Sequence, residues 1–313
     1  MNREVRIGVV TAWPEVDWHS DRLVAVLSGS ARVVTLAPES FSARVRGERT
    51  ELWAGDEPAR SLDAFVLVRG LGRVGDADLQ FELYRALEDE GALVVNRLDA
   101  LLSAQDKFRT SRLLARAGVP TPPSAVAQRE EDALRVLAGL GDAVMKPVAG
   151  SLGDGVVRVH DDAAGRAAVR ERAARDGGIY LQAWVEHPGR DARVFVVGGR
   201  ARAAIARVAP PGEWRTNVAG GGEAEAVELS PVLASTAEAA ALAVGLDYAG
   251  VDLVLGRVGA WVIEVNGNPS WRGILGATGL DMAEPIADHV LARALRRRGA
   301  SAHIVSTGVT HGG

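Results

Sequence analysis

The stretch from Gly250 to Trp271 reads GVDLVLGRVGAWVIEVNGNPSW, two β-rich apolar runs separated by a turn-like Arg-Val-Gly. This pattern predicts a β-hairpin over 251–265. Residues two apart in a strand share a face, which places Glu264 and Asn266 side by side with Asp252 opposite them. These three oxygen-bearing side chains suit Mg²⁺, completed by substrate phosphates. The alternative is that the carboxylates flank a strand end and face solvent, but charged residues inside apolar runs favour a site.

Length and composition restrict the number of domains and exclude several classes of function. A chain of 313 residues can hold two or three modest domains, and it contains no Cys, which excludes disulfides and thiolate chemistry. The net charge is −4 and the basic residues are scattered, so we expect no nucleic-acid partner. The first residues lack the layout of a signal peptide, and no apolar run has membrane-spanning length. We therefore expect a cytoplasmic protein that does not enter the membrane.

The chain divides into regions of different pattern. Residues 1–98 alternate strands (5–11, 32–36, 64–69, 93–96) with helices (21–27, 78–90), which predicts an open α/β domain. A helix over 103–117 and a proline-rich connector at 119–123 follow. Residues 99–186 predict an α+β lobe and 187–300 a second, strand-rich lobe that holds the hairpin and ends in a helix over 282–297. The polar segment 301–313 is expected to be a flexible tail.

A glycine-rich loop follows a strand that contains Lys146. Gly150, Ser151, Gly153 and Gly155 lie between that strand and the next, and their amides can approach an anion closely. Such a loop alone is more often just a turn, but a lysine inside an apolar run requires a partner, and a triphosphate is one. Lys107, near the start of a predicted helix, is either a second such cation or a solvated side chain.

These motifs occur in an order that resembles the ATP-grasp superfamily, and within it the RimK-type amino-acid ligases. The order runs through AQDK at 104–107, MKP at 145–147, the glycine loop, QAWV at 182–185, DAR at 191–193, WRTN at 214–217, Asp252 and EVN at 264–266. The resemblance covers residues 95–297. In the runs 189–198 and 266–273 the chain looks most like the tetrahydromethanopterin:glutamate ligase branch and the related deazaflavin-coenzyme glutamate ligases.

The resemblance implies an ATP-grasp fold, in which an N-terminal open α/β domain precedes two α+β lobes that clasp ATP. The glycine loop is then a lid, and the metal ligands hold Mg²⁺, or Mn²⁺ in its place. Asp191 becomes the candidate for the ribose hydroxyls, and Ala183 replaces a glutamate that many relatives have at the adenine hinge. The nucleotide-binding set implied by the resemblance comprises Lys107, Lys146, Gly150, Ser151, Gly153, Gly155, Gln182, Ala183, Trp184, Val185, Asp191, Arg215, Thr216 and Asn217.

The activity implied is ligation of a carboxylate to an amine through an acyl phosphate, with release of ADP. Arg193, Arg207 and Arg215 are the expected catalytic cations, since the planar guanidinium fork suits phosphate and carboxylate groups. The loop with Asn268, Ser270, Trp271 and Arg272 is expected to bind the acceptor carboxylate. Trp271 either stacks on a flat substrate or packs on the scaffold. The six histidines show no mutual ligand spacing, and we expect no catalytic role for them.

We expect the enzyme to add L-glutamate or a similar amino acid to a small-molecule carboxylate and to form a homo-oligomer. One alternative is a peptide or D-alanine:D-alanine-type ATP-grasp ligase of natural-product biosynthesis. The other is a regulator that binds ATP without catalysis, which the complete set of metal ligands, lysines and loop glycines argues against. Fold similarity cannot name the substrate.

Overall fold

The fold is described from a computed structural model that covers residues 3–13, 16–69, 75–147, 155–216, 223–256 and 259–307, with the backbone alone for 300–307. Packing groups the chain into two compact units, Met1–Leu98 with Asp281–Gly313, and Asp99–Leu280. Each unit is described by itself below. The domain limits expected at residues 98, 186 and 300 stay predictions.

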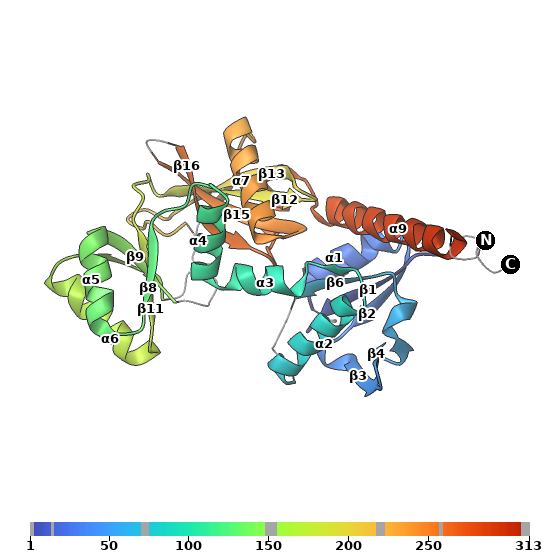
Figure 1. Ribbon diagram of the computed structural model, residues 1–313. Coiled ribbons are helices and arrows are strands. Elements are labelled where there is room, and N and C mark those ends of the chain that lie inside the picture. The colour runs from blue at the N-terminus through green and yellow to red at the C-terminus, as the bar shows by residue number, and fades with distance from the viewer. Residues whose placement is uncertain are drawn as a thin grey trace. The chain divides into compact units, whose positions relative to one another are not determined.

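The first unit contains a parallel sheet (Figure 1). Its strand order is β2-β1-β6-β7, formed by Arg32–Leu36, Arg6–Thr11, Ala64–Arg69 and Val94–Val95. β1 and β6 are almost wholly buried, as expected for parallel strands covered on both faces. Helices α1 (Trp18–Leu27) and α9 (Ala283–Thr307) pack against each other, and α2 (Ala77–Asp89) is capped by Asp76, whose carboxylate accepts from the Leu79 N–H.

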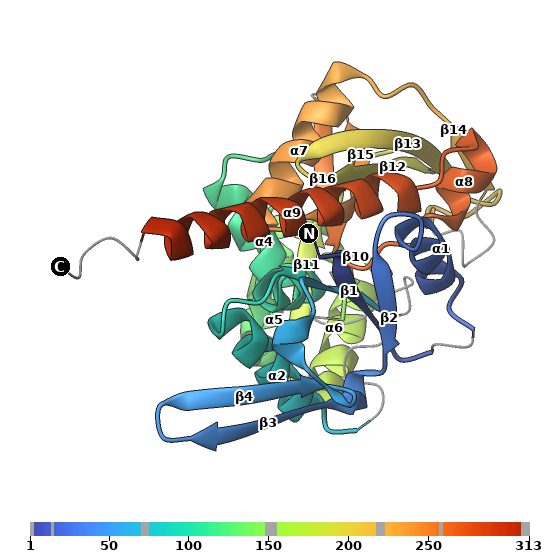
Figure 2. The ribbon, with the colours of Figure 1, turned by 90° about the vertical axis from the view of Figure 1, so that its right-hand side faces the viewer.

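The same unit has a small antiparallel sheet that the sequence pattern does not predict. Its strands β3 (Phe41–Arg46), β4 (Arg49–Ala54) and β5 (Glu57–Pro58) lie between the short 3₁₀ turns Pro38–Ser40 and Ala59–Ser61. Figure 2 shows β3 and β4 as a long antiparallel ribbon. Every residue of β3 after Phe41 is exposed, so the strand lacks the alternation of apolar and polar residues by which a half-buried strand is recognised.

The second unit starts with two helices where the sequence predicts one. α3 (Leu98–Gln105) ends before Asp106, which has an extended backbone, and α4 (Lys107–Arg116) begins after it. The Asp106 carboxylate accepts from the Arg109 N–H at 2.8 Å, so this residue caps a new helix. The single helix expected over 103–117 is therefore wrong.

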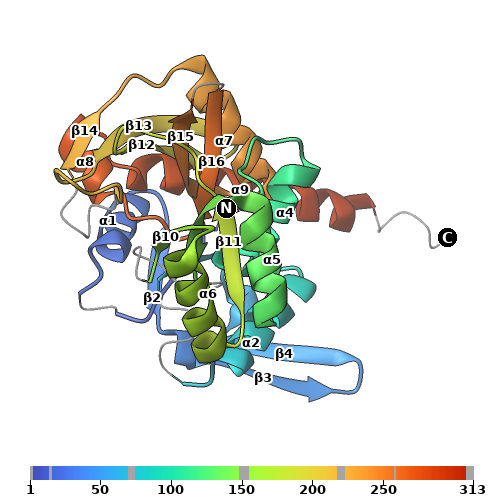
Figure 3. The ribbon, with the colours of Figure 1, turned by 90° about the vertical axis from the view of Figure 1, so that its left-hand side faces the viewer.

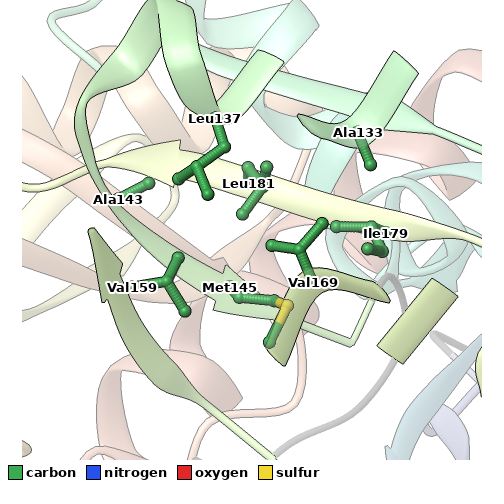
Figure 4. Packing of buried hydrophobic residues seen from close by; sticks show 8 residues of the cluster. All are labelled: Ala133, Leu137, Ala143, Met145, Val159, Val169, Ile179 and Leu181. Carbon is green, nitrogen blue, oxygen red and sulfur yellow. The ribbon is translucent and has the colours of Figure 1, made fainter. Parts of the chain in front are cut away.

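A four-stranded antiparallel sheet follows, in the order β10-β9-β11-β8. Its strands are Val157–His160, Asp142–Lys146, Ile179–Ala183 and Ser124–Ala127, and Figure 3 shows α5 (Glu130–Leu140) and α6 (Ala163–Asp176) side by side over β11. The helices and the sheet bury one apolar cluster (Figure 4). The cluster consists of Ala133, Leu137, Ala143, Met145, Val159, Val169, Ile179 and Leu181.

The second sheet of this unit has the order β14-β13-β12-β15-β16. The strands are Glu223–Ala226, Arg200–Val208, Arg190–Val197, Tyr248–Gly256 and Gly259–Asn266, and β14 is not foreseen from the sequence. α7 (Pro231–Val244) begins after Ser230, whose side chain caps it, and ends at Gly245, which has a φ of 84°.

Two helical segments differ from the expected pattern. A short helix α8 (Arg272–Thr278) follows β16 where only a loop is expected, and α9 continues to Thr307, into the segment expected to be a flexible tail. None of the helices in the described ranges is both long enough and apolar enough to cross a membrane.

Candidate functional site

The hairpin of β15 and β16 brings Asp252 and Glu264 directly opposite each other. The pairing shifts by one residue at this point, since Asp252 pairs with Glu264 while Leu253 pairs with Val262, leaving Ile263 as a bulge. Directly opposed residues of antiparallel strands project to the same face. The next pair on that face is Gly250 with Asn266. Asp252, Glu264 and Asn266 therefore share one face of the hairpin, and the bulge sets this register; their role as metal ligands stays a prediction.

Asp252 is the centre of a buried ion-pair network. The carboxylate is 1 % exposed and accepts a fork from Arg193, with Nε at 2.7 Å from Oδ1 and Nη2 at 2.8 Å from Oδ2. A second guanidinium, from Arg207, places Nη2 at 2.9 Å from Oδ2. Arg193 on β12 lies directly opposite Asp252 on β15, so the pairing of these two strands brings the guanidinium to the carboxylate. Forks of this kind combine strong charge-assisted hydrogen bonds with a fixed orientation.

Arg207 also links the network to a second buried carboxylate. Its Nε donates to Asp191 Oδ1 at 2.8 Å, and the hydroxyl of Thr216 donates to Asp191 Oδ2 at 2.6 Å. Asp191, Arg207 and Thr216 are all buried. Asp191 is expected to hold the ribose hydroxyls of ATP, but here both its oxygens accept from protein donors. The ribose-binding role stays a prediction. It would require Asp191 to accept hydrogen bonds from the ribose hydroxyls in addition to those from Arg207 and Thr216.

Within this network the surrounding opposite charges favour the ionised forms of Asp252 and Arg207. Burial acts to raise the pKa of Asp252, but the guanidiniums of Arg193 and Arg207 outweigh it, and the pKa lies below its ordinary value. Burial acts in the opposite direction on Arg207, yet Asp252 and Asp191 raise the pKa of its guanidinium further above the ordinary value. The network pairs two carboxylates with two guanidiniums, so the sheet buries these charges without a net charge.

Lys146 ends β9 and is held by Gln182. Its Nζ donates to Gln182 Oε1 at 2.7 Å, and Gln182 is buried. Although Lys146 as a residue is half-buried, burial of the ammonium lowers its pKa to about 8; Lys107 adds to this shift, while Glu264 and Asp252 oppose it. The ammonium of Lys146 is therefore close enough to Lys107, Glu264 and Asp252 to interact with their charges.

Lys107 and Lys146 are the only lysines in the chain, which otherwise has arginine at every basic position. A compact ammonium differs from a guanidinium in size, hydration and readiness to lose its proton. Lys107 and Glu264 line the same pocket, between α4 and β16. The rest of the lining is supplied by Ala104, Thr110, Ser111, Leu114, Thr121, Ile263 and Val265. Lys107 thus lies at the same pocket as the predicted metal ligand Glu264.

The donor atoms here fit a hard cation. A carboxylate offers about four lone-pair sites, and three of those on Asp252 are filled by its arginines, which leaves one on Oδ1. No described residue donates a hydrogen bond to the Glu264 carboxylate. Asn266 Oδ1 accepts from the Asn268 N–H at 2.9 Å and keeps a second lone pair. Within the described ranges no group of three or more His, Cys, Asp or Glu could hold a metal, so a cation at this place would also need the Asn266 amide and ligand oxygens.

The predicted adenine hinge is only partly available to a base. The Ala183 and Trp184 N–H groups donate to the Pro123 and Asp142 carbonyls at 2.8 and 3.0 Å, which leaves Val185 as the backbone reader among the predicted set. The Trp184 indole is covered by the Arg158 guanidinium, 3.9 Å from the ring centroid. Sequence reasoning missed this contact because Arg158, on β10, and Trp184, just after β11, are brought together only by the fold.

The base of the glycine loop is held by arginines. The Arg172 Nη2 on α6 donates to the Gly155 carbonyl at 2.6 Å, and the exposed Arg215 places Nη1 at 3.3 Å from the Val156 carbonyl. Arg172 is buried and paired with Asp176. Sequence reasoning missed Arg172 because α6 contains four arginines and no local pattern distinguishes the buried one. Four predicted nucleotide-binding residues lie outside the described residues: Gly150, Ser151, Gly153 and Asn217.

The loop after β16 has a different character from the one expected. Trp271 is 1 % exposed and packs edge-to-face on Phe195, with ring centroids 6.2 Å apart. It is a core residue in this structure, so we leave it out of the substrate site. Asn268 and Ser270 are half-buried, and Arg272 is exposed at the start of α8. These three stay candidates for substrate binding.

Comparison with known proteins agrees with this arrangement. The model of the RimK-like ATP-grasp domain matches residues 104–290. The tetrahydromethanopterin:alpha-L-glutamate ligase of Methanosarcina acetivorans is 35% identical, over 91% of this chain and 98% of its own length. The enzyme of the same name from Methanococcus maripaludis is 31% identical, over 92% and 98%.

Solved structures resemble the chain over nearly its whole length. The ATP-grasp ligase PsnB, in complex with the precursor peptide PsnA2 and AMPPNP, has a TM-score of 0.71 at 24% identity, covering 94% of this chain and 99% of PsnB. The D-alanine–D-alanine ligase of Bacillus anthracis, complexed with ATP, has a TM-score of 0.66 at 18% identity, covering 95% and 99%. These likenesses show that the fold is the ATP-grasp fold, as the sequence predicts.

Proposed function

The chain belongs to the RimK-like ATP-grasp family and is an ADP-forming carbon–nitrogen ligase, and from this premise we propose that it joins L-glutamate or a similar amino acid to a small-molecule carboxylate. The names of its curated relatives, alpha-L-glutamate ligases, supply the amino acid in this proposal. The acceptor is left at the level of a carboxylate, because relatives at about a third identity can differ in the molecule they modify.

One observation carries the proposal: Lys107 and Glu264 line one pocket, and the buried ammonium of Lys146 interacts electrostatically with Lys107, Glu264 and Asp252. These two lysines are the only ones in the sequence. An ATP-dependent ligase must attract a polyanion and hold a cation beside it. Ammonium groups opposite a carboxylate pair with spare lone pairs meet both requirements. A structural ion pair would need neither two lysines nor carboxylate oxygens left without donors.

The proposed reaction has two steps. The acceptor carboxylate attacks the γ-phosphorus of ATP, and the bond to the β–γ bridging oxygen breaks, giving an acyl phosphate and ADP. The amine of the amino acid then attacks the acyl carbon, loses a proton, and expels inorganic phosphate as the amide forms. Mg²⁺, held by Asp252, Glu264 and Asn266, would supply charge neutralisation at the phosphates.

The residues of the chain divide by what they contact. Lys107, Lys146 and Arg215 are the proposed cations toward the nucleotide, since none of them is fixed in the buried network. Arg193 and Arg207 are held by buried carboxylates, so we assign them as positioning residues that fix Asp252 and Asp191. Their loss should therefore alter metal dependence as well as turnover.

The proposal is tested by ADP release. The full chain is incubated with ATP, Mg²⁺, L-glutamate and a panel of small carboxylic acids, and products are read by the mass gain of one glutamyl residue. The expected result is ADP formation that needs both acid and amine and that is lost in Glu264→Gln. Equal ADP release in the presence and absence of L-glutamate, with no mass gain, would contradict the proposed amine.

The nucleotide site has a second test that does not depend on turnover. An acyl-phosphate derivative of ATP acylates lysines near bound phosphates, and here only Lys107, Lys146 and the amino terminus can react. We expect labelling at a lysine that excess ATP suppresses, while labelling of the amino terminus is unaffected. Lysine labelling that excess ATP does not suppress would argue against the assigned nucleotide site. It would support either a different position for ATP or a protein that binds ATP without catalysis.

The second candidate is a peptide ligase, favoured by the likeness to PsnB, which was captured with a precursor peptide. Product mass separates the two candidates, because a peptide ligase would not require free L-glutamate. A D-alanine ligase is separated in the same way. A homo-oligomer in the cytoplasm completes the proposal, and sedimentation of the full chain tests the oligomeric state.

A further inference from the structure

A second polar cluster lies in the first unit, at the carboxyl ends of β1 and β6. The chain leaves β1 toward β2 on one side and returns to β6 on the other, so these neighbours form the switch point of the parallel sheet. Ligands of open α/β sheets bind outside the carboxyl ends of the strands at such a point. Thr11 ends β1 and Arg69 ends β6.

A bulge directs Arg69 to this position. Val10 pairs with Leu67, but the next residue, Thr11, pairs with Arg69, so Val68 is the extra residue. Bulges next to sites re-aim a side chain that regular pairing would send elsewhere. Without the bulge Thr11 would stand opposite Val68. The shift thus places a guanidinium opposite the Thr11 hydroxyl.

Buried polar side chains concentrate here. Of the six buried polar residues in the described part of Met1–Leu98, four belong to this cluster: Thr11, Asp17, His19 and Ser20. The hydroxyls of Thr11 and Ser20 donate to Asp17 Oδ2, the former at 3.3 Å. The imidazole Nδ1 of His19 lies 3.2 Å from Asp17 Oδ1. Asp17 therefore fixes the orientation of the imidazole.

Asp17 remains ionised in this setting. Burial acts to raise its pKa, but hydrogen bonds from His19 and Ser20 outweigh burial and hold the pKa at about 2. One carboxylate charge is therefore present at the edge of the sheet at neutral pH, and Arg69 supplies one positive charge beside it.

The hydrogen-bonding capacity of Arg69 is not used by a carboxylate. Its Nη2 lies 3.4 Å from both Nδ1 and Nε2 of His19, which puts the guanidinium nitrogen against the ring and outside the usual range of 2.7–3.2 Å for such bonds. Within the described residues no Asp or Glu forms an ion pair with Arg69. Arg69 is half-buried, and its guanidinium has donors that no carboxylate among the described residues uses.

We propose that Arg69 and His19 form a carboxylate-binding site of the first unit, which holds a carboxylate of the amino-acid substrate, while Asp17, Thr11 and Ser20 position the imidazole. The inference rests on the proposed function for the identity of the substrate. The fork of Arg69 takes both oxygens of a planar carboxylate. A phosphate dianion fits less well, because Asp17 already carries a negative charge beside a single guanidinium.

The probe for this site is L-glutamate, titrated calorimetrically into the full chain with Mg²⁺ and a non-hydrolysable ATP analogue. We expect Arg69→Met to weaken binding at least about tenfold, which corresponds to about 1.4 kcal/mol. Arg69→Lys, which keeps the charge and loses the fork, should lose less. Arg32→Met is the matched control, since exposed Arg32 starts β2 at the opposite edge of the same sheet and should bind as the wild type does.

Four outcomes would overturn the inference: no binding of L-glutamate to the wild type, equal affinity in Arg69→Met, a loss of affinity that follows a fall in melting temperature, or inorganic phosphate competing at Arg69. If Arg69→Met does not fold, Arg69→Lys decides the same question. A chain that binds L-glutamate through Arg69 but releases no ADP would support this site while contradicting the proposed reaction.

Discussion

Replacing Asp252 by Asn should destabilise the five-stranded sheet of the second unit and leave the stability of the first unit unchanged. The substitution keeps the shape of the side chain but removes the charge that pairs with Arg193 and Arg207. Two guanidiniums would then share a single buried carboxylate, that of Asp191. Removing one partner of a buried ion pair costs about 3–5 kcal/mol, because the remaining charge stays desolvated.

Native-state hydrogen exchange measures this cost locally. A loss of about 3–5 kcal/mol corresponds to amide exchange faster by about two to three and a half powers of ten in peptides from β12 and β15. Peptides from β1 and β6 belong to the first compact unit and should exchange at the wild-type rate. This internal comparison is needed because a chain of two units has no single unfolding free energy.

Asp142→Asn is the matched control. Asp142 also accepts a fork, from Arg158 at 3.1 and 2.6 Å, but the two side chains are 33% and 30% exposed. Solvent screening limits a pair of this kind to about 1 kcal/mol or less. If Asp252→Asn changed exchange in β12 and β15 no more than Asp142→Asn does in β9, the account of a buried network that depends on Asp252 would be refuted.

Three further changes have definite expected outcomes. Lys146 loses its charge as pH rises through about 8, so wild-type affinity for ATP should fall between pH 7 and 9, and calorimetry of Lys146→Gln should show weaker binding with no such slope. Arg172→Met removes the donor to the Gly155 carbonyl, so KM for ATP should rise several-fold with little change in kcat, and Arg172→Lys should restore part of the loss; an unchanged KM would show that this contact does not position the loop. Gly250→Ala puts a methyl group 2.8 Å from Pro269 Cβ, and native-state hydrogen exchange of peptides from β15 should show a local destabilisation of about 1–3 kcal/mol, whereas unchanged exchange would mean that the proline moves freely.

Much of the fold follows from local signals that the sequence displays. The hairpin of β15 and β16 is visible as two apolar runs around a turn, and α7 is bounded by a Ser-Pro start and a glycine end. The break at Asp106 carries a local signal too, since Asp is a favoured cap, but an Asp within a helical pattern can equally face solvent. The local sequence is compatible with one continuous helix or with two helices separated at Asp106, and the folded chain contains two.

The ion pairing of the site could not be predicted in the same way. Which guanidinium meets Asp252 depends on the register of β12 against β15, and the bulges at Ile263 and Val68 set the facing of Glu264 and Arg69. No short-range pattern encodes a one-residue slip, although such a slip changes which side chains meet. The expectation that residues 1–98 contain no GxGxxG spacing is wrong, because residues 70–75, between β6 and α2, read GLGRVG. Residues 70–74 lie outside the described part of the chain.

The two kinds of basic residue in the second unit therefore have different tasks. Arg193 and Arg207 are matched by buried carboxylates, so they contribute no net attraction for a polyanion and instead hold Asp252 with one lone pair still open. In the proposed site, attraction for the nucleotide would then come from Lys107, Lys146 and the exposed Arg215. A lysine whose pKa is about 8 gains stability for its charge when a phosphate approaches, whereas an arginine is charged already. This difference gives a physical reason for lysine at these two positions in a chain that is otherwise built with arginine.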